Sequence, residues 1–165
     1  MSNGQTKRYF GKFRGVVTNN SDPLMLGRIQ AKVQDVLGDK ESSWAMPSVP
    51  YAGKNVGLFL IPPTDALVWI EFEHGDPDYP IWSGCFWASG EAPASPAVAD
   101  MKVLKTNVGT ITVNDQQGSG GITIETTSGL KIVMNTNGIE ISNGSQKIML
   151  SSASVSINDT ALEVQ

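Results

Sequence analysis

The chain has 165 residues, a formal net charge of −4 and one cysteine. This length accommodates one ordinary domain, or a small domain with an appendage. The acidic balance argues against a nucleic-acid binder and against a polybasic membrane anchor, because both depend on clustered cations. A lone cysteine excludes an internal disulfide and fits a reducing compartment. The polar segment Met1–Arg8 precedes no apolar stretch, which predicts that there is no signal peptide.

The composition changes near residue 100. All four Trp, all five Phe, all three Tyr and all nine Pro lie before Met101, and the last 65 residues are mostly Ile, Val, Thr, Ser, Asn and Gly. Small residues and spaced prolines just before this point are typical of an extended connector. We therefore expect an N-terminal arm (residues 1–8), a first domain (9–87), a linker (88–100) and a second domain (101–165).

The first domain alternates apolar and polar residues, as half-buried strands do. Within 27–34, Ile29, Ala31 and Val33 share one face, and within 66–73 Val68, Ile70 and Phe72 do. Residues 12–17, 57–61 and 81–86 are further strand candidates, and a turn around 41–44 is the best candidate for a helix. About five short strands predict a small closed barrel of the OB type.

The second domain repeats one unit. Pairs of apolar residues two positions apart alternate with turns of Gly, Asn, Asp or Ser. Such a regular strand–turn array is a repeat architecture. The pairs are Ile111/Val113, Ile122/Ile124, Ile132/Met134, Ile139/Ile141, Ile148/Leu150, Val155/Ile157 and Leu162/Val164.

These short strands are not expected to be stable in one isolated chain. Burying an Ile or Val contributes ~1.5–3 kcal/mol, against a backbone ordering cost of ~1–2 kcal/mol per residue. Three chains wound around one axis, with the pairs pointing inward, would bury them and leave no long sheet edge. We therefore expect an all-β protein, with an OB-type barrel followed by an intertwined trimeric β-helix whose core is the seven pairs. Seven strands at a spacing of ~4.8 Å give a needle of roughly 35 Å.

Other chemically suggestive residues have simpler interpretations. His74 fits the end of a hairpin, and the carboxylates Glu71 and Glu73 fit the solvated face of a strand. Cys85 is expected to be buried and inert. We expect no catalytic residue, no cofactor and no metal ligand. Trp69 should point away from the core, and we consider Trp69 and Trp82 as contacts with another subunit or protein.

An ordered set of segments resembles a known family. It begins with Gly15-Val-Val-Thr-Asn-Asn-Ser-Asp-Pro23 and Leu26-Gly-Arg-Ile29 and includes Glu73-His-Gly-Asp-Pro-Asp-Tyr-Pro-Ile81, Gly84 and the closing Ala161-Leu-Glu-Val164. Over residues 9–165 the chain resembles phage baseplate assembly protein V and the VgrG-type spike proteins of type VI secretion. No lysozyme-like insertion, C-terminal His-x-His or effector extension accompanies these segments.

The resemblance implies a homotrimeric, non-enzymatic central spike of a phage tail or contractile injection particle, assembled in the cytoplasm of the producing cell. It implies that the OB domain docks to hub and tube proteins, and that the needle transiently meets the target cell envelope. A PAAR-like tip protein would cap the C-terminal end, at Leu162, Val164 and Gln165.

Two other functions are compatible with parts of the sequence. An OB barrel can bind single-stranded nucleic acid through aromatics and a basic groove, but the chain is acidic and its tail is too regular for disorder. A peptidoglycan hydrolase spike would need the missing catalytic insertion.

Overall fold

The structure of the protein, a computed structural model, describes residues 7–159 and 161–164. It divides into two compact units, with the boundary in the sequence between Gly90 and Glu91. Nearly all of the regular structure is β-strand, as the sequence predicted. No helix in the described ranges is long and apolar enough to cross a bilayer.

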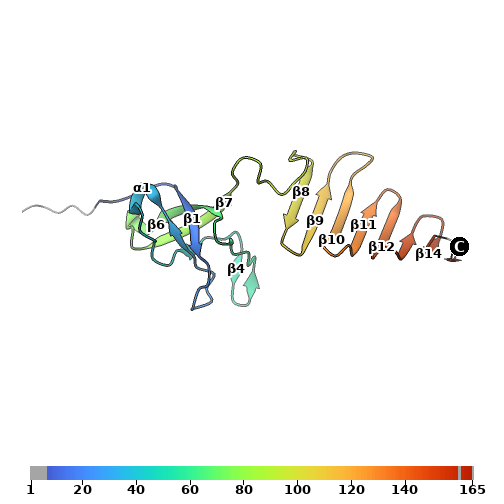
Figure 1. Cartoon of the computed structure of the whole chain (residues 1–165), viewed down its shortest axis with the longest axis horizontal. Helices are drawn as coiled ribbons and strands as arrows, with labels where there is room; N and C mark the ends of the chain where they lie inside the picture. The colour runs from blue at the N-terminus through green and yellow to red at the C-terminus, as the bar shows by residue number, and fades with distance from the viewer. Residues whose placement is uncertain (1–6, 160, 165) are drawn as a thin grey trace, which may run out of the picture. The chain divides into compact units, whose positions relative to one another are not determined.

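The first unit is a curled five-stranded sheet (Figure 1). Its strand order is β2-β1-β6-β7-β3, with β3 and β7 parallel and the other pairs antiparallel. The strands are β1 (Phe13–Asn19), β2 (Gln30–Lys32), β3 (Met46–Pro47), β6 (Leu67–Phe72) and β7 (Pro80–Phe86). Ile29 and Ala45, which precede β2 and β3, exchange two backbone hydrogen bonds of 3.2 and 2.7 Å. This bridge joins the two edges, so the sheet closes in the manner of an OB barrel.

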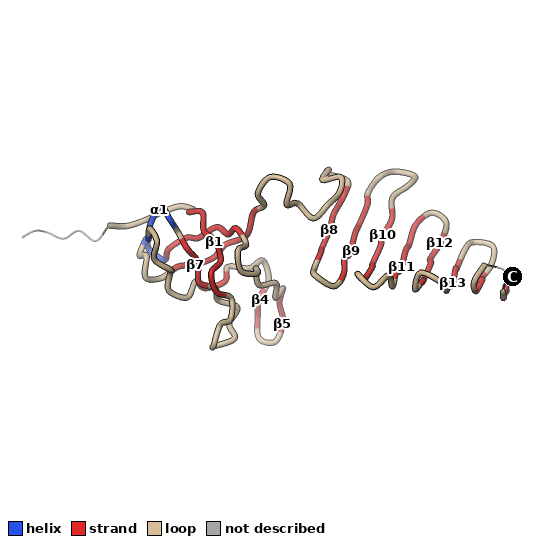
Figure 2. Tube along the Cα trace, in the orientation of Figure 1, coloured by secondary structure: helices blue, strands red, loops and turns tan. Residues whose placement is uncertain are grey.

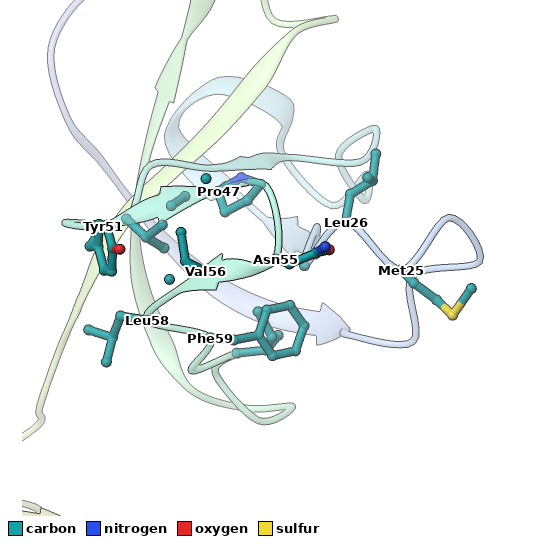
Figure 3. A pocket seen from close by; sticks show the side chains of 14 residues that line it. Met25, Leu26, Pro47, Tyr51, Asn55, Val56, Leu58 and Phe59 are labelled. Atoms are coloured by element: carbon teal, nitrogen blue, oxygen red, sulfur yellow. The ribbon is translucent and has the colours of Figure 1, made fainter.

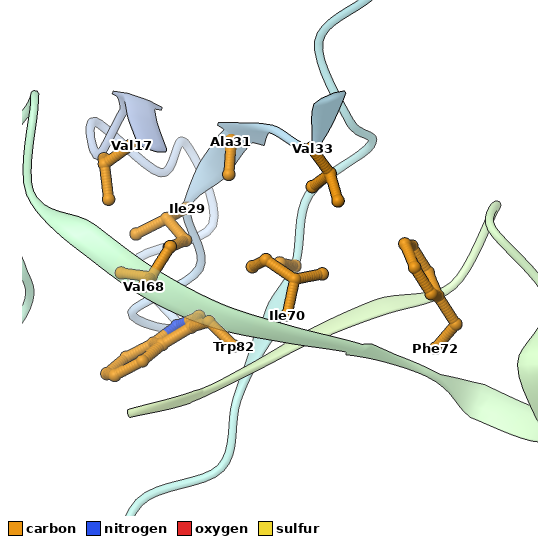
Figure 4. Packing of buried hydrophobic residues seen from close by; sticks show 9 residues of the cluster. Val17, Ile29, Ala31, Val33, Val68, Ile70, Phe72 and Trp82 are labelled. Atoms are coloured by element: carbon orange, nitrogen blue, oxygen red, sulfur yellow. The ribbon is translucent and has the colours of Figure 1, made fainter. Parts of the chain in front are cut away.

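The barrel encloses the core of the first unit (Figure 4). Both predicted faces are confirmed, because their alternate residues are buried. Trp82 also lies in this core, only 4% exposed, and its Nε1 donates a hydrogen bond of 3.1 Å to the carbonyl oxygen of Gly27. The buried side chains are Val17, Ile29, Ala31, Val33, Ala45, Val68, Ile70, Phe72 and Trp82.

Three sequence-based expectations about the first unit are wrong. The helical turn is α1 (Gln34–Leu37), whose Val36 and Leu37 pack on the core, and not the segment 41–44. The segment 57–61 forms almost no strand, because only β4 (Ala52–Gly53) and β5 (Val56–Gly57) pair, as a separate small hairpin. Cys85 is exposed rather than buried, although partial desolvation raises the pKa of its thiol. A short 3-10 turn, η1 (Glu73–Gly75), joins β6 to β7.

An ion pair anchors the loop between β1 and β2. Arg28 Nη2 lies 2.6 Å from Asp22 Oδ1, and the two side chains are only 15% and 4% exposed. The Asp22 carboxylate also accepts hydrogen bonds from the backbone N–H groups of Leu24, Leu26 and Arg28. The hydrogen bonds from the Arg28 side chain, followed by those from the backbone, hold the pKa of Asp22 well below its usual value.

The second unit is a single eight-stranded antiparallel sheet in which every strand pairs with its sequence neighbours (Figures 1 and 2). Turns capped by Asn and Ser side chains join the strands: the Asn143 carboxamide oxygen, for example, accepts from the Gln146 backbone N–H at 2.8 Å. The strands are β8 (Met101–Lys105), β9 (Gly109–Asn114), β10 (Gly121–Thr126), β11 (Lys131–Asn135), β12 (Gly138–Ser142), β13 (Lys147–Leu150), β14 (Val155–Ile157) and β15 (Leu162–Val164).

Replacing Asp22 by Asn tests the loop anchor. We expect Asp22→Asn to lower the thermal midpoint of the first unit by several degrees at pH 7, because Arg28 loses its ionised partner. The pKa of Asp22 is lowered by folding, so its stabilisation is complete above about pH 4 and is lost as the pH falls through the lowered pKa. The difference between wild type and variant should therefore be smaller at pH 2 than at pH 7.

Near-ultraviolet dichroism is the suitable measurement, because all aromatic residues precede Met101 and the signal reports on the first unit. Asp39→Asn is the matched control, since the Asp39 side chain is 90% exposed and pairs only with Lys32. An equal fall in the thermal midpoint of Asp22→Asn and Asp39→Asn would contradict the anchoring role of Asp22.

Candidate functional site

The most distinctive surface of the second unit is a pair of apolar columns that cross all of its strands. In each antiparallel pair the apolar residues of one strand stand directly opposite those of the next: Ile124 opposite Ile111 and Ile132, for instance. Directly opposite residues point to the same face of a sheet. One column is Leu104, Ile111, Ile124, Ile132, Ile141, Ile148, Ile157 and Leu162, and the other is Lys102, Val113, Ile122, Met134, Ile139, Leu150, Val155 and Val164.

All seven predicted pairs therefore fall on strands and on one face, which we call the column face. The side chains of Val164 and Gln165, and the structure of Gln165, lie outside the described residues, so Val164 is placed only by its backbone pairing with Val155. Sequence reasoning missed β8, whose Leu104 extends one column. It was missed because Lys102 occupies the apolar position beside it, which hides the period-two pair.

The described part of the second unit leaves the column face uncovered. Most of its aliphatic side chains are exposed, although they are the most apolar residues of the sheet. The central row of the opposite face, by contrast, is half-buried throughout. That row is Val103, Thr112, Thr123, Val133, Glu140, Met149 and Ser156. A large exposed apolar surface of this kind marks an interaction site.

The column face is hollowed rather than flat. A depression of about 500 Å³ lies over β11 to β14 and is lined on its apolar side by Leu130, Ile132, Ile141, Ile148 and Ile157. Leu130, at the end of the turn before β11, was not among the predicted residues. Polar residues, among them Ser142, Asn143 and Gln146, line the rest of the depression. Its aliphatic side is suited to the aliphatic side chains of another subunit.

The first unit carries a second apolar surface around the β4–β5 hairpin (Figure 3). Met25 and Leu26 from the anchored loop, with Tyr51, Val56 and Phe59 from the hairpin region, line a pocket of about 500 Å³. The Phe59 side chain is 71% exposed and that of Met25 is 85% exposed. We call this surface the hairpin patch.

The two tryptophans proposed from sequence differ in position. Trp82 is in the core, so the expectation that it lies at an interface is wrong; it follows Ile81 in a strand with apolar residues on both faces, and alternation turns its side chain inward. Trp69 is half-buried on the outer face of the barrel. Its ring packs against Phe86 at 4.6 Å between centroids, and the Arg14 guanidinium lies 5.8 Å from it.

The titratable side chains singled out from the sequence lie apart in ordinary structural positions. Glu71 forms an ion pair of 3.3 Å with Lys12, whereas Glu73 and His74 belong to the 3-10 turn. Among the described residues, no group of three or more His, Cys, Asp or Glu side chains is placed to hold a metal ion.

Comparisons with known protein families match both units. Residues 13–87 match the family described as "Type VI secretion system/phage-baseplate injector OB domain", and residues 101–163 match the "Phage baseplate V C-terminal trimerisation domain". No curated protein gives a significant match. The matched domains define a structural, spike-like component of the phage tail.

The chain belongs to the phage baseplate assembly protein V family. Its second unit is the trimerisation domain of that family, which supports a homotrimer.

A charge introduced on the column face should disrupt this trimer. Ile124→Asp would place one carboxylate from each chain among apolar side chains, and an unpaired buried charge is strongly unfavourable. We expect the variant to run as a monomer in size-exclusion chromatography with light scattering. Thr123→Asp is the matched control, because the neighbouring residue points to the opposite face. A trimeric Ile124→Asp variant would exclude the column face from the subunit contact.

Proposed function

We propose that three copies of the chain pack their column faces around one axis and form the needle of a central spike. The observation that carries this proposal is the pair of continuous columns that the described residues of the second unit leave uncovered. In a trimer each strand level contributes two inward side chains per chain, and burying an Ile in this way contributes ~1.5–3 kcal/mol. The needle is proposed to span residues 101–165, after a linker at 88–100, an OB domain at 9–87 and an arm at 1–8.

The geometry of the sheet supports a role in piercing a target envelope. Hydrogen bonds between neighbouring strands run along the direction in which the strands are stacked, and eight strands at ~4.8 Å extend roughly 38 Å. An axial load would be carried by the hydrogen-bond ladders and by the dry aliphatic core together. The turns contain mostly polar residues and keep the outside of such a needle soluble.

The OB domain is proposed to dock on the hub and tube proteins. The hairpin patch supports this role better than the buried Trp82 does, because it gathers exposed aliphatic and aromatic side chains around one pocket. The ion pair of Asp22 with Arg28 holds the loop that presents Met25 and Leu26. Trp69 remains a second proposed contact on the outer face of the barrel.

The C-terminal strand is proposed to receive a PAAR-like tip protein. Among the described strands β15 pairs with β14 alone, so its other edge can offer backbone donors and acceptors to a further protein strand. Leu162 is 55% exposed on this last strand. Three such edges at one end of a trimer would give a blunt apolar platform that another protein can cover.

The location of the protein in tail particles tests the spike proposal. Particles purified from the producing cells should bind gold-labelled antibodies against this chain at the distal end of the tail, at the baseplate. Antibodies against a sheath protein serve as the control for labelling along the tail. Label along the sheath or on the head would contradict the proposed role.

Phe59→Asp tests the docking role of the hairpin patch. We expect a soluble trimer that is incorporated into tail particles at a level at least severalfold below wild type, because a charge replaces an apolar contact at the centre of the patch. The readout is the amount of the chain in purified particles. Tyr79→Asp changes another exposed aromatic residue, outside the patch, and should be incorporated normally. Normal incorporation of Phe59→Asp would contradict docking through this surface.

A further inference from the structure

The column face contains one charged residue within its two columns. Lys102 occupies the first position of the second column, directly opposite Val113. Its ammonium group forms an ion pair with Asp115, which lies two residues beyond Val113 and on the same face. Both side chains are about half exposed in the single chain. Within the two columns β8 therefore carries a charged side chain, whereas the column positions of the later strands are all apolar.

The aliphatic positions of the two columns do little to fix how one chain aligns with another along the axis. Ile stands at six successive levels of one column, from Ile111 to Ile157. Neighbouring strands are antiparallel, so a shift of one chain by two strands, about 10 Å, restores both strand direction and the aliphatic contacts. Because the contacts would be nearly equivalent, the apolar packing alone distinguishes poorly between aligned and shifted chains.

We propose that Lys102 and Asp115 of the three chains form an ionic collar that fixes the alignment of the trimer. This inference rests on the proposed packing of the column faces around one axis. In the aligned trimer the three lysines on β8 and the three aspartates that follow β9 form two neighbouring rings, so each charge has partners of opposite sign close by. In a trimer shifted by two strands, Lys102 of one chain would instead face the aliphatic level of β10 in another, and its charge would be desolvated without that ring of partners.

The collar specifies alignment without adding stability. A buried ion pair can often be replaced by apolar residues of similar volume with no loss of stability, and a single polar group in an otherwise apolar seam is a known way to fix register. Lys102→Met should therefore give trimers at least as resistant to heat as wild type, but with a mixture of alignments. If Lys102 only stabilised the trimer, Lys102→Met should give trimers that are less resistant to heat but are all aligned.

Disulfide trapping in the full-length chain can measure the alignment. Ile122 and Ile139 lie in one column two strands apart. Two differently tagged chains, one with Ile122→Cys and one with Ile139→Cys, are co-expressed in a Cys85→Ser background. A disulfide needs the two Cβ atoms within about 4.5 Å, so a bond between the two tags forms only in shifted trimers.

With Lys102 present we expect almost no bond between the two tags, and with Lys102→Met we expect that product to rise severalfold. Lys105→Met is the matched control, because it removes the same charge from the same strand on the opposite face. It should give the low wild-type level. Equal cross-linking in Lys102→Met and Lys105→Met would overturn the collar.

A second test needs no introduced cysteine. Lys102→Asp places six carboxylates in two neighbouring rings and should reduce the trimer fraction severalfold in light scattering, whereas adding Asp115→Lys should restore it. An unaffected trimer in Lys102→Asp would also overturn the collar. If the unmodified chain is itself a monomer, the proposed needle fails; if it is a trimer and the Lys102 variants behave like wild type, only the collar fails.

Discussion

The structure depends on a sheet whose backbone hydrogen bonds are formed within one chain but whose apolar face is not buried by that chain's own sheet. Each strand of the second unit pairs with its neighbours in sequence, so no segment of that sheet returns over the column face. Backbone pairing alone does not offset the entropy lost on ordering the chain. Association with other copies is therefore part of the folding of this unit, in line with its identity as a trimerisation domain.

The first unit buries its apolar surface within a single chain. Its sheet curls until Ile29 and Ala45 join the two edges, and nine apolar side chains then bury one another inside the barrel. Because this core is complete in one chain, the apolar residues left outside are available for recognition. They gather on the loop held by Asp22 and Arg28 and on the neighbouring hairpin.

The sequence predicted the repetitive parts well and the irregular parts poorly. Seven of the eight strands of the second unit follow from apolar pairs separated by turn residues, and the eighth was hidden by Lys102. In the barrel, alternation identified the faces of Ile29 and Ile70, but it was ambiguous in β7, where apolar residues occupy both faces and Trp82 turns inward. The hairpin patch could not be predicted, because an apolar run that stays exposed has the same composition as a buried strand.

The division of aromatic residues follows from these two ways of burying apolar surface. A barrel core is irregular, so it can enclose one Trp82 ring and satisfy its N–H with the carbonyl oxygen of Gly27. A needle built from identical levels has no such individual positions, and each level must fit the next one along the axis. Branched aliphatic side chains meet that condition, since they are compact and have few rotamers. The uniformity that makes such a core continuous also removes the landmarks that align its chains, which is why a single charged level at one end of the sheet can have a large effect on assembly.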